Sequence, residues 1–486
     1  MSAPPQLDGW IAAQARFAAA RMLEAISATH LVMERPAFGQ RIIPRPGSVL
    51  ASPVPAHYDP DPDYFFHWFR DAAIVIDALR VALEAGFIDR SAITRFRDFV
   101  QFSRSLHDLD GRELLGHSDF RAKVQPAFLQ YVRPDTEIAA LSGQAVQADV
   151  RVNADGTLDF IRWSRPQTDG PALRCVALLR WWRQFPELRE DSTLRSGLSE
   201  AILADLAFTL TRVNEPASDV WEEQSGYHYH TQLLQAEALT RGAEWLEETG
   251  HSARARPSRL AAQETLARLD GLWDDTAGFY RSRAPTALGP ARDLDIAVVL
   301  ATLHAERAGG RHSVLDPRTQ ATLTMLEELF EAQYAINRDR PRDRGLAMGR
   351  YANDSYYSGG AWYLATLGAA EFYFSLATAA RRGAHIDLVQ TNARFRERLG
   401  AGEAATGAEW ARLAIERGDA IMRTVQAFTP ASGELSEQFD QSTGAQTSAK
   451  HLSWSYAAFI TAAARRAAAL RSTRAAVPGA MPADTA

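Results

Sequence analysis

The stretch Trp68-Phe69-Arg70-Asp71-Ala72-Ala73-Ile74-Val75-Ile76 joins a loop of aromatic and charged residues to a run of apolar ones. Apolar residues then recur with a period near 3.6, which predicts a helix over 68–87. A long loop, 29–67, leads into this helix, whereas a short link leads out of it to the next one. The same asymmetry recurs along the chain and indicates how the helices are arranged.

Hydrophobic periodicity, interrupted at clusters of Gly, Pro, Asn and Asp, predicts about twelve helices. They cover 9–28, 68–87, 90–107, 169–185, 193–213, 226–249, 252–271, 292–308, 316–338, 358–383, 406–427 and 452–471. Counted from the N-terminus, links from an even to an odd helix are mostly short, with 384–405 as the exception. Links from an odd to an even helix are mostly long: 29–67, 108–168, 214–225, 272–291, 339–357 and 428–451.

These connections predict a ring of helices. Short connections join antiparallel neighbours, so an up-and-down ring places the long links at one end, where we expect the active site. The alternation predicts a closed all-α double ring of inner and outer helices in a single domain. No repeat of about 20–50 residues recurs, which disfavours a solenoid. We expect the domain to cover 1–470, and 471–486, rich in Ala and Pro, to form a disordered tail.

The composition limits the possible functions. The chain has 486 residues, 46% hydrophobic and 23% charged, which supports a large core and excludes global disorder. Its 59 acidic and 53 basic residues form no long run of either sign, so no nucleic-acid partner is expected. No apolar stretch approaches the roughly 18–20 residues that cross a bilayer, so no membrane partner is expected either. A small, uncharged partner is favoured, and the oligomeric state is left open.

Features of export, disulfides and metal sites are missing from the sequence. The residues after Met1 show no signal peptide, which favours a cytoplasmic protein, or a periplasmic or secreted one if the start is misassigned. The single cysteine, Cys175, excludes a disulfide framework and a Cys-based zinc site. His228 and His230 are two residues apart and do not share a helical face, and the prolines of 59–63 favour a rigid turn over a calcium loop. We expect no metal and no cofactor.

Tryptophans gather in the long links. Five of the 11 lie in these links or within a few residues of the helices that follow: Trp68, Trp163, Trp221, Trp362 and Trp454. Each one alone is typical of a hydrophobic core. Together with Arg, Asp and Glu at one end of a ring they favour a sugar site, because sugar rings stack on indoles and sugar hydroxyls bind charged groups.

Two of the long links supply candidate carboxyl groups. Asp219, Glu222 and Glu223 lie within five residues of each other, on either side of Trp221. If the indole is buried, one carboxyl is desolvated and its pKa rises, as a general acid at neutral pH requires. Glu437 in the link 428–451 could be a second carboxyl across a scissile glycosidic bond. Solvated loop charges remain an alternative at this point.

Six blocks of the sequence together form a more specific pattern. The blocks are Gly47-Ser48-Val49-Leu50-Ala51-Ser52-Pro53, Asp63-Tyr64 through Trp68-Phe69-Arg70-Asp71, Arg165-Pro166-Gln167-Thr168-Asp169-Gly170-Pro171-Ala172-Leu173-Arg174, Asp219-Val220-Trp221-Glu222-Glu223, Arg350-Tyr351 with Asp354-Ser355-Tyr356-Tyr357 and Trp362, and Ser436-Glu437-Gln438-Phe439-Asp440 with Leu452-Ser453-Trp454-Ser455-Tyr456-Ala457. In this order, they resemble the glucoamylases of glycoside hydrolase family 15. The resemblance covers the chain from Leu7 to about residue 470.

The resemblance implies an (α/α)6 barrel and an inverting exo-hydrolase that releases β-glucose from the non-reducing ends of α-glucans. By motif, Glu222 is the implied general acid, Glu437 the general base, and Asp219 a secondary candidate for the base. Inversion predicts that the carboxyl groups of Glu222 and Glu437 lie roughly 6.5–9.5 Å apart, with room for one water.

The resemblance also implies a set of substrate-binding residues. Those implied for the terminal glucose are Tyr64, Trp68, Arg70, Asp71, Arg350 and Trp454. Those implied for neighbouring positions are Trp163, Arg165, Val220, Glu223, Asp354 and Trp362. Three departures from the family pattern are Phe66, Ser164 and the pair Lys450-His451, and loop 108–162 cannot be aligned.

Other activities stay open. After residue 470 there is no room for a separate starch-binding domain, so soluble dextrins are favoured over granular starch. Isomalto-oligosaccharides, dextran ends or trehalose are alternative substrates, and a catalytically inactive carbohydrate-binding relative is an alternative function. A lyase would need a basic cleft and a phosphorylase a phosphate site, and the sequence indicates neither.

Overall fold

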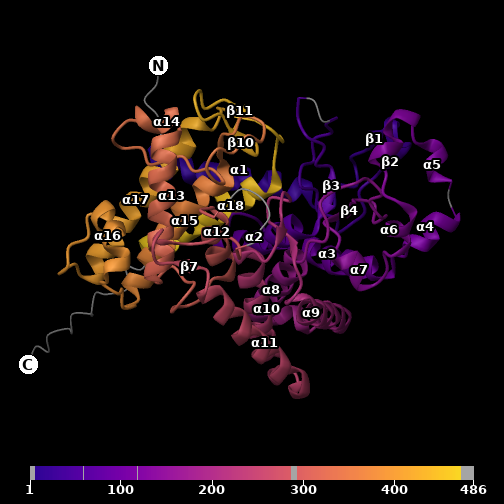
Figure 1. The fold of residues 1–486 in the computed structure, drawn as a ribbon, viewed down its shortest axis with the longest axis horizontal. Coiled ribbons are helices and arrows are strands. Elements are labelled where there is room, and N and C mark those ends of the chain that lie inside the picture. The colour runs from indigo at the N-terminus through magenta and orange to yellow at the C-terminus, as the bar shows by residue number, and fades with distance from the viewer. Residues whose placement is uncertain (1–5, 58–59, 118, 286–292, 472–486) are drawn as a thin grey trace, which may run out of the picture.

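The computed structural model describes residues 6–57, 60–117, 119–285 and 293–471. Within them, one set of long helices forms an inner ring: α2 (Phe69–Ala85), α8 (Asp169–Gln184), α10 (Tyr229–Glu248), α12 (Ala297–Ala305), α15 (Tyr363–Arg381) and α18 (Ser453–Arg471). Each helix contacts the next in this order, and α18 contacts α2, so the ring closes (Figure 1).

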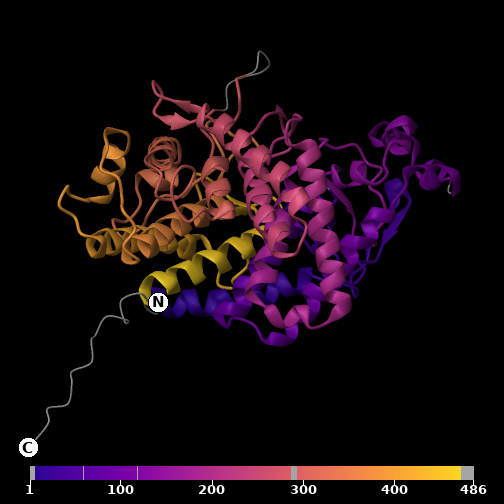
Figure 2. The same ribbon diagram turned by 90° about the horizontal axis from the view of Figure 1, so that it is seen from below.

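A second set of helices alternates with the first along the chain and packs outside it. These outer helices are α1 (Leu7–Ala25), α3 (Ile93–Ser105), α9 (Ser192–Arg212), α11 (Ser252–Asp270), α13 (Pro317–Gln333) and α17 (Gly407–Phe428). Figure 2 shows α1 beside α18, which brings the two ends of the described chain together. The fold is an (α/α)6 barrel, as predicted, and the long helices lie close to the predicted ranges.

The two rings differ in how their side chains are buried. The inner helix α15 is buried on nearly every side from Tyr363 to Phe374, as expected for a helix packed all round. The outer helix α17 buries a stripe that includes Trp410, Ala414 and Ile421, at helical spacing. A Cβ built on Gly418 of α17 would lie 2.5 Å from the ring of Phe374, so the two helices approach closely only with glycine there.

Short helices and strands occupy the links. The helices of the links are shorter than those of the rings: α4 (Gly111–His117), α5 (Phe120–Lys123), α6 (Asp135–Ala139), α7 (Gln144–Gln147), α14 (Ala335–Arg338) and α16 (Ala393–Leu399). The 3-10 turns are η1 (Pro36–Phe38), η2 (Arg90–Ala92), η3 (Leu106–Asp108), η4 (Pro126–Tyr131), η5 (Pro186–Arg189) and η6 (Gln390–Asn392).

The strands form small antiparallel sheets that tie distant links together. They are β1 (Met33–Arg35), β2 (Gln40–Ile42), β3 (Phe66–Trp68), β4 (Arg151–Asn153), β5 (Ala217–Ser218), β6 (Ser225–Gly226), β7 (Trp273–Asp274), β8 (Phe279–Tyr280), β9 (Ala361–Trp362), β10 (Gln438–Phe439) and β11 (Gln446–Thr447). β1 pairs with β2, β3 with β4, β5 with β6 and β7 with β8, and β10 lies between β9 and β11. In these pairings Trp68 lies opposite Arg151, and Gln438 lies opposite Trp362.

Segments 33–42 and 119–163, which we call the side lobe, project from the barrel on the side away from α16 and α17 (Figure 1). Aromatic and aliphatic residues such as Phe38, Phe120 and Phe160 give this lobe a hydrophobic cluster of its own, which also includes Trp68. The lobe is therefore anchored to the strand that leads into α2.

Some sequence predictions fall outside these residues. The predicted tail lies outside the described residues from 472 onward, so the division into a domain and a tail stays a prediction. Position 59 of the predicted rigid turn also lies outside the described residues. In the part of the chain that is described, no helix is long and apolar enough to cross a membrane.

Candidate active site

A cavity of about 520 Å³ opens where the inner helices begin. Among the described residues, five of the six links that lead into inner helices contribute to its wall. The residues that line it are Ala51, Tyr64, Trp68, Arg70, Asp71, Arg162, Trp163, Ser164, Val220, Trp221, Glu222, Glu223, Arg350, Tyr356, Trp362, Leu364, Glu437, Leu452 and Trp454. Most of the predicted site residues are thus brought together in one pocket, and Arg165, Asp219 and Asp354 are not part of its wall.

Glu222 lies in a tight turn between β5 and β6. Its φ is 64°, in the left-handed region that residues other than glycine rarely adopt and that is often found at functional sites. Trp68 Nε1 and Arg70 Nη2 donate to Glu222 Oε1 at 2.8 and 3.0 Å. Trp163 Nε1 donates to Oε2, so both carboxylate oxygens are held by donors within the pocket.

Asp219 closes the turn that presents Glu222. Its Oδ1 accepts the N–H of Glu223 at 2.8 Å, and its backbone carbonyl accepts the N–H of Glu222 at 3.0 Å. The same carbonyl accepts Gln167 Nε2 at 3.0 Å. These contacts give Asp219 a structural part in the turn, whereas its predicted part as a secondary base stays a prediction.

Glu437 immediately precedes β10 and is only 4% exposed. Burial raises its pKa to about 7, against the hydrogen bond that the Ser448 hydroxyl donates to Oε2 and the positive charge of Arg350. The backbone N–H of Glu437 donates to Ala449 at 2.8 Å, and its carbonyl accepts the N–H of Tyr363 at 3.2 Å. The backbone that carries this carboxyl is thus bonded to the start of α15 on one side and to the segment after β11 on the other.

The carboxylate of Asp354, which is not part of the pocket wall, binds the guanidinium of Arg350. Its Nε and Nη2 donate to the two oxygens of Asp354 at 2.7 and 2.6 Å, which is the strong bidentate geometry of an arginine–carboxylate pair. Arg350 Nη2 also lies 3.0 Å from Glu223 Oε1. Asp354 thus orients an arginine that lines the pocket, and its predicted contact with substrate stays a prediction.

Arg165 belongs to a buried network of charges behind the pocket. It pairs with Asp149 and, at 3.0 Å, with Asp159. Asp159 also accepts Arg151 Nε at 2.9 Å. The Arg151 guanidinium lies 4.0 Å from the ring centroid of Trp163 and 4.6 Å from that of Trp68. Arg165 therefore anchors the loop that carries Trp163, and its predicted contact with substrate stays a prediction.

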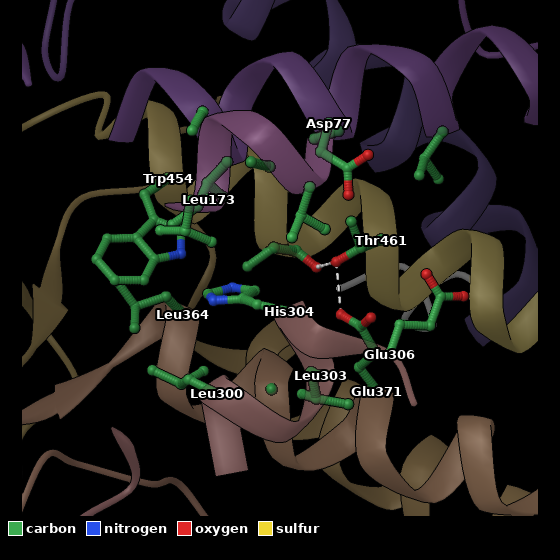
Figure 3. A pocket seen from close by; sticks show the side chains of 18 of the residues that line it. Asp77, Leu173, Leu300, Leu303, His304, Glu306, Leu364, Glu371, Trp454 and Thr461 are labelled. Atoms are coloured by element: carbon green, nitrogen blue, oxygen red, sulfur yellow. Dashed lines mark hydrogen bonds between the residues drawn. The ribbon is translucent and has the colours of Figure 1, made fainter. Parts of the chain in front are cut away.

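Below the pocket the interior of the barrel narrows. Trp454 and Leu364 also line a second, much smaller cavity of about 60 Å³ farther along the barrel axis (Figure 3). In Figure 3 the ring of His304 lies beneath the indole of Trp454, and the hydroxyl of Thr461 points to Glu371. At the base of this cavity charged side chains pair with one another: Arg180 with Asp77 and Glu306, and Arg465 with Glu306.

A further buried carboxyl lies next to Arg70. Asp169 at the start of α8 is unexposed, and burial raises its pKa to about 7, opposed by the charge of Arg70. His230 Nδ1 lies 3.7 Å from Asp169 Oδ2. Burial lowers the pKa of His230 well below its usual value, so this histidine is neutral. Over the described residues, no group of three or more His, Cys, Asp or Glu side chains could hold a metal ion.

Some residues of the site were given no individual role from the sequence. Tyr356, whose hydroxyl lies 2.7 Å from that of Tyr64, stands within a quoted block and could have been assigned one. Trp221 belongs to the tryptophans that favour a sugar site, and its Nε1 donates to Asp295 Oδ2 at 2.9 Å. Ser448, the donor to Glu437, immediately follows β11, where no motif marks it.

Known proteins resemble the chain over most of its length. The sequence pattern described as Glycosyl hydrolases family 15 matches residues 134–464. Glucoamylase-1 of Schizophyllum commune is 30% identical over 438 residues, 87% of this chain and 69% of that protein. A glucoamylase of Neurospora crassa is 27% identical over 433 residues, 87% of this chain and 63% of that protein. The solved structure of a glycoside hydrolase family 15 glucoamylase from Hypocrea jecorina matches with a TM-score of 0.78 and 25% identity, covering 95% of this chain and 72% of that one.

Proposed function

The chain belongs to glycosyl hydrolase family 15 and is an α-glucoside hydrolase, and we propose that it releases β-D-glucose from the non-reducing ends of soluble α-1,4-glucans and maltodextrins. The single observation that carries the proposal is the placement of Glu222 and Glu437, which are distant in sequence, on the wall of one pocket lined with indoles, arginines and carboxylates. Inverting glycoside hydrolysis needs such a pair of carboxyl groups on either side of the scissile bond.

Glu222 acts as the general acid in this proposal. It transfers its proton to the glycosidic oxygen while the bond from that oxygen to the anomeric carbon breaks. The carboxylate that is left receives hydrogen bonds from Trp68 Nε1 and Arg70 Nη2. These fixed donors stabilise the negative charge as it develops, which favours loss of the proton.

Glu437 acts as the general base. It removes a proton from water while the water oxygen bonds to the anomeric carbon from the face opposite the leaving group, which gives the β anomer. Burial makes this carboxylate a stronger proton acceptor, because it raises the pKa of Glu437 to about 7. The hydrogen bond from Ser448 and the charge of Arg350 keep the ionised form accessible.

The shape of the pocket supports removal of single terminal units. The cavity ends on Trp454 and Leu364, below which lies a cavity of only about 60 Å³, too small for a hexose, with ion pairs at its base. A glucan chain therefore enters by one end only, with its terminal hexose innermost. Arg70, Asp71 and Tyr64 lie on the wall around that hexose, where charged and hydroxyl groups can bind its hydroxyls.

The test is product analysis by NMR or polarimetry on maltose and longer maltodextrins. We expect β-glucose as the first product, with no internal fragments, and the same assay on isomaltose and trehalose ranks the alternative substrates. First appearance of α-glucose, or of oligosaccharides from the chain interior, would refute the inverting exo mechanism. Absence of hydrolysis with intact binding of maltose would favour a carbohydrate-binding relative.

A further inference from the structure

A second cavity of about 470 Å³ adjoins the active-site pocket. Trp163 and Arg162 line both cavities, so their side chains form the partition between them. The rest of the second cavity's wall comes mainly from the side lobe and includes Phe38, Phe128, Tyr131 and Ile161. We call this space the lobe cavity.

Of the two residues between the cavities, Trp163 contacts Glu222 and is held by neighbouring side chains. Trp163 Nε1 donates to Glu222 Oε2, and the indole packs on the guanidinium of Arg151 at 4.0 Å from ring centroid to Cζ. Arg151 is itself unexposed and paired with Asp159 at 2.9 Å. Trp163 is therefore fixed at its polar edge and by a buried cation, and is only partly buried overall.

The position of the partition decides which part of a substrate reaches the lobe cavity. On the proposed function, Glu222 protonates the oxygen that joins the terminal glucose to its leaving group, so the leaving group lies beside Glu222 and Trp163. The lobe cavity lies on the other side of Trp163 and Arg162. It is thus placed to receive the far part of the leaving group and not the glucose that is released.

The lobe cavity is lined mainly by apolar surface. Phe38 and Phe128 meet edge to face with ring centroids 5.6 Å apart, and Phe128 lies 6.0 Å from the ring of Tyr131, which is 50% exposed. The charged residues in its wall are engaged with other partners. Arg35 Nε donates to Asp63 at 2.6 Å and its guanidinium lies over the ring of Phe66, and Arg162 Nε donates to the carbonyl of Val132 at 3.1 Å.

This lining contrasts with that of the active-site pocket, where Arg70, Asp71, Glu223 and Arg350 offer charged partners for hydroxyl groups. A sugar in the lobe cavity could stack one face on an aromatic ring, but its hydroxyls would find fewer charged partners than in the active-site pocket, and burying them without partners is costly. An apolar group of similar size gains free energy from the same burial.

We propose that the lobe cavity binds an apolar aglycone, so that the enzyme also hydrolyses α-glucosides of hydrophobic alcohols and phenols. The inference rests on the proposed function. The bond between the anomeric carbon and the glycosidic oxygen breaks, the departing alcohol takes the proton of Glu222, and water supplies the new hydroxyl while Glu437 takes its proton. The oxidation states of all the atoms remain unchanged.

The first experiment compares kcat/KM on hexyl α-D-glucoside, maltose and maltopentaose for the wild type, Tyr131→Ser and Phe128→Ala. Leu129→Ser is the matched control, because Leu129 is an exposed residue of the same turn that does not line the cavity. We expect kcat/KM on the hexyl glucoside to fall about tenfold for each cavity variant, with values on maltose within about twofold of wild type and no change in the control. Equal losses on maltopentaose, or no loss on the hexyl glucoside, would overturn the proposal.

The second experiment measures binding without turnover. Calorimetry on the full chain carrying Glu437→Gln compares hexyl with methyl α-D-glucoside, and we expect the hexyl compound to bind at least about tenfold more tightly. Phe128→Ala in the same background should remove that preference. Equal affinities would refute the aglycone site. A preference for the hexyl compound in a protein that fails to hydrolyse maltose would refute the proposed function while leaving the aglycone site supported.

Discussion

Glu222 and Glu437 line one pocket but sit in two different kinds of backbone. Glu222 lies in a left-handed turn, and its carboxylate accepts hydrogen bonds from the indoles of Trp68 and Trp163 and from a guanidinium. Glu437 immediately precedes a buried strand, and its buried carboxylate accepts the hydroxyl of Ser448. The neighbours thus differ as the two proposed roles require: donors that receive a new negative charge around Glu222, and burial that strengthens a base at Glu437.

The strongest test of this contrast removes each carboxyl in turn. Glu222→Gln and Glu437→Gln should each lower kcat on maltose by about 10²–10⁴-fold, because each loses a proton-transfer group. On α-D-glucosyl fluoride, whose leaving group needs no proton, Glu222→Gln should recover most of its activity, and Glu437→Gln should not. Steady-state kinetics on both substrates measure this. Recovery by the Glu437 variant alone would reverse the two roles.

Asp219→Asn is the matched control for that experiment. Asp219 lies in the same turn as Glu222 but outside the pocket wall, with its carboxylate bonded to the backbone of Glu223. We expect less than about a tenfold loss of kcat, as for a lost backbone hydrogen bond. A loss as large as that of Glu437→Gln would instead favour Asp219 as the base.

A smaller effect is expected from the carboxylate behind Arg350. Asp354→Asn breaks a buried bidentate pair and leaves the guanidinium less firmly oriented, so kcat/KM on maltose should fall about 10–100-fold, mainly through KM. Asp110→Asn breaks a similar but exposed pair with Arg112 and should leave kcat/KM unchanged. If both variants behaved alike, the clamp on Arg350 would have no part in binding.

The hydroxyl donor to Glu437 gives a prediction for pH dependence. With Glu437 as a base whose pKa is about 7, kcat/KM should rise with pH through about 7. Ser448→Ala removes the hydrogen bond that favours the carboxylate, so the pKa rises and the acid limb moves up by about 0.5–1 pH unit. Profiles of kcat/KM between pH 4 and 9 measure this. A limb that moved to lower pH would contradict the base role.

The smallest effect is expected for the way in which the free energy of unfolding changes with pH. Burial raises the pKa of Glu437 and of Asp169 above that of an unfolded carboxyl, so the folded state holds these protons more tightly. Their stabilisation is therefore complete below the unfolded pKa and is lost as pH rises through about 7. Asp169→Asn, which stays neutral, should reduce the fall in stability between pH 5 and 8.5 by about 1–3 kcal/mol. Thermal unfolding at constant ionic strength measures it, with Leu129→Ser expected to keep the wild-type slope.

Hydrophobic periodicity predicted most of the fold. The ring helices follow from apolar spacing and turn residues, and α17, predicted at 406–427, is found at Gly407–Phe428. Predicted helix starts differ from the structure where a link forms a strand. The helix predicted from 358 begins at Tyr363, because Ala361 and Trp362 pair with β10. That pairing depends on a partner far along the chain, which local spacing does not reveal.

For the site, too, the sequence predicted one part and missed another. Motifs identified residues that the structure places on the pocket wall, such as Glu222 and Glu437. They did not separate residues that face the pocket from residues that support it. Arg165 and Asp354 lie within the same blocks, but their charges are taken up by Asp159 and Arg350. Which partner a charged side chain takes depends on the folded backbone and cannot be predicted from spacing.

The narrowing of the barrel beneath Trp454 and Leu364 has a consequence for the proposed removal of successive sugars. If terminal hexoses are released as proposed, each one leaves by the route through which the polymer came in. The shortened polymer would then have to withdraw before the product departs and dock again for the next cut. On the proposed function the enzyme is therefore not processive, and exit of the monosaccharide competes with every new encounter.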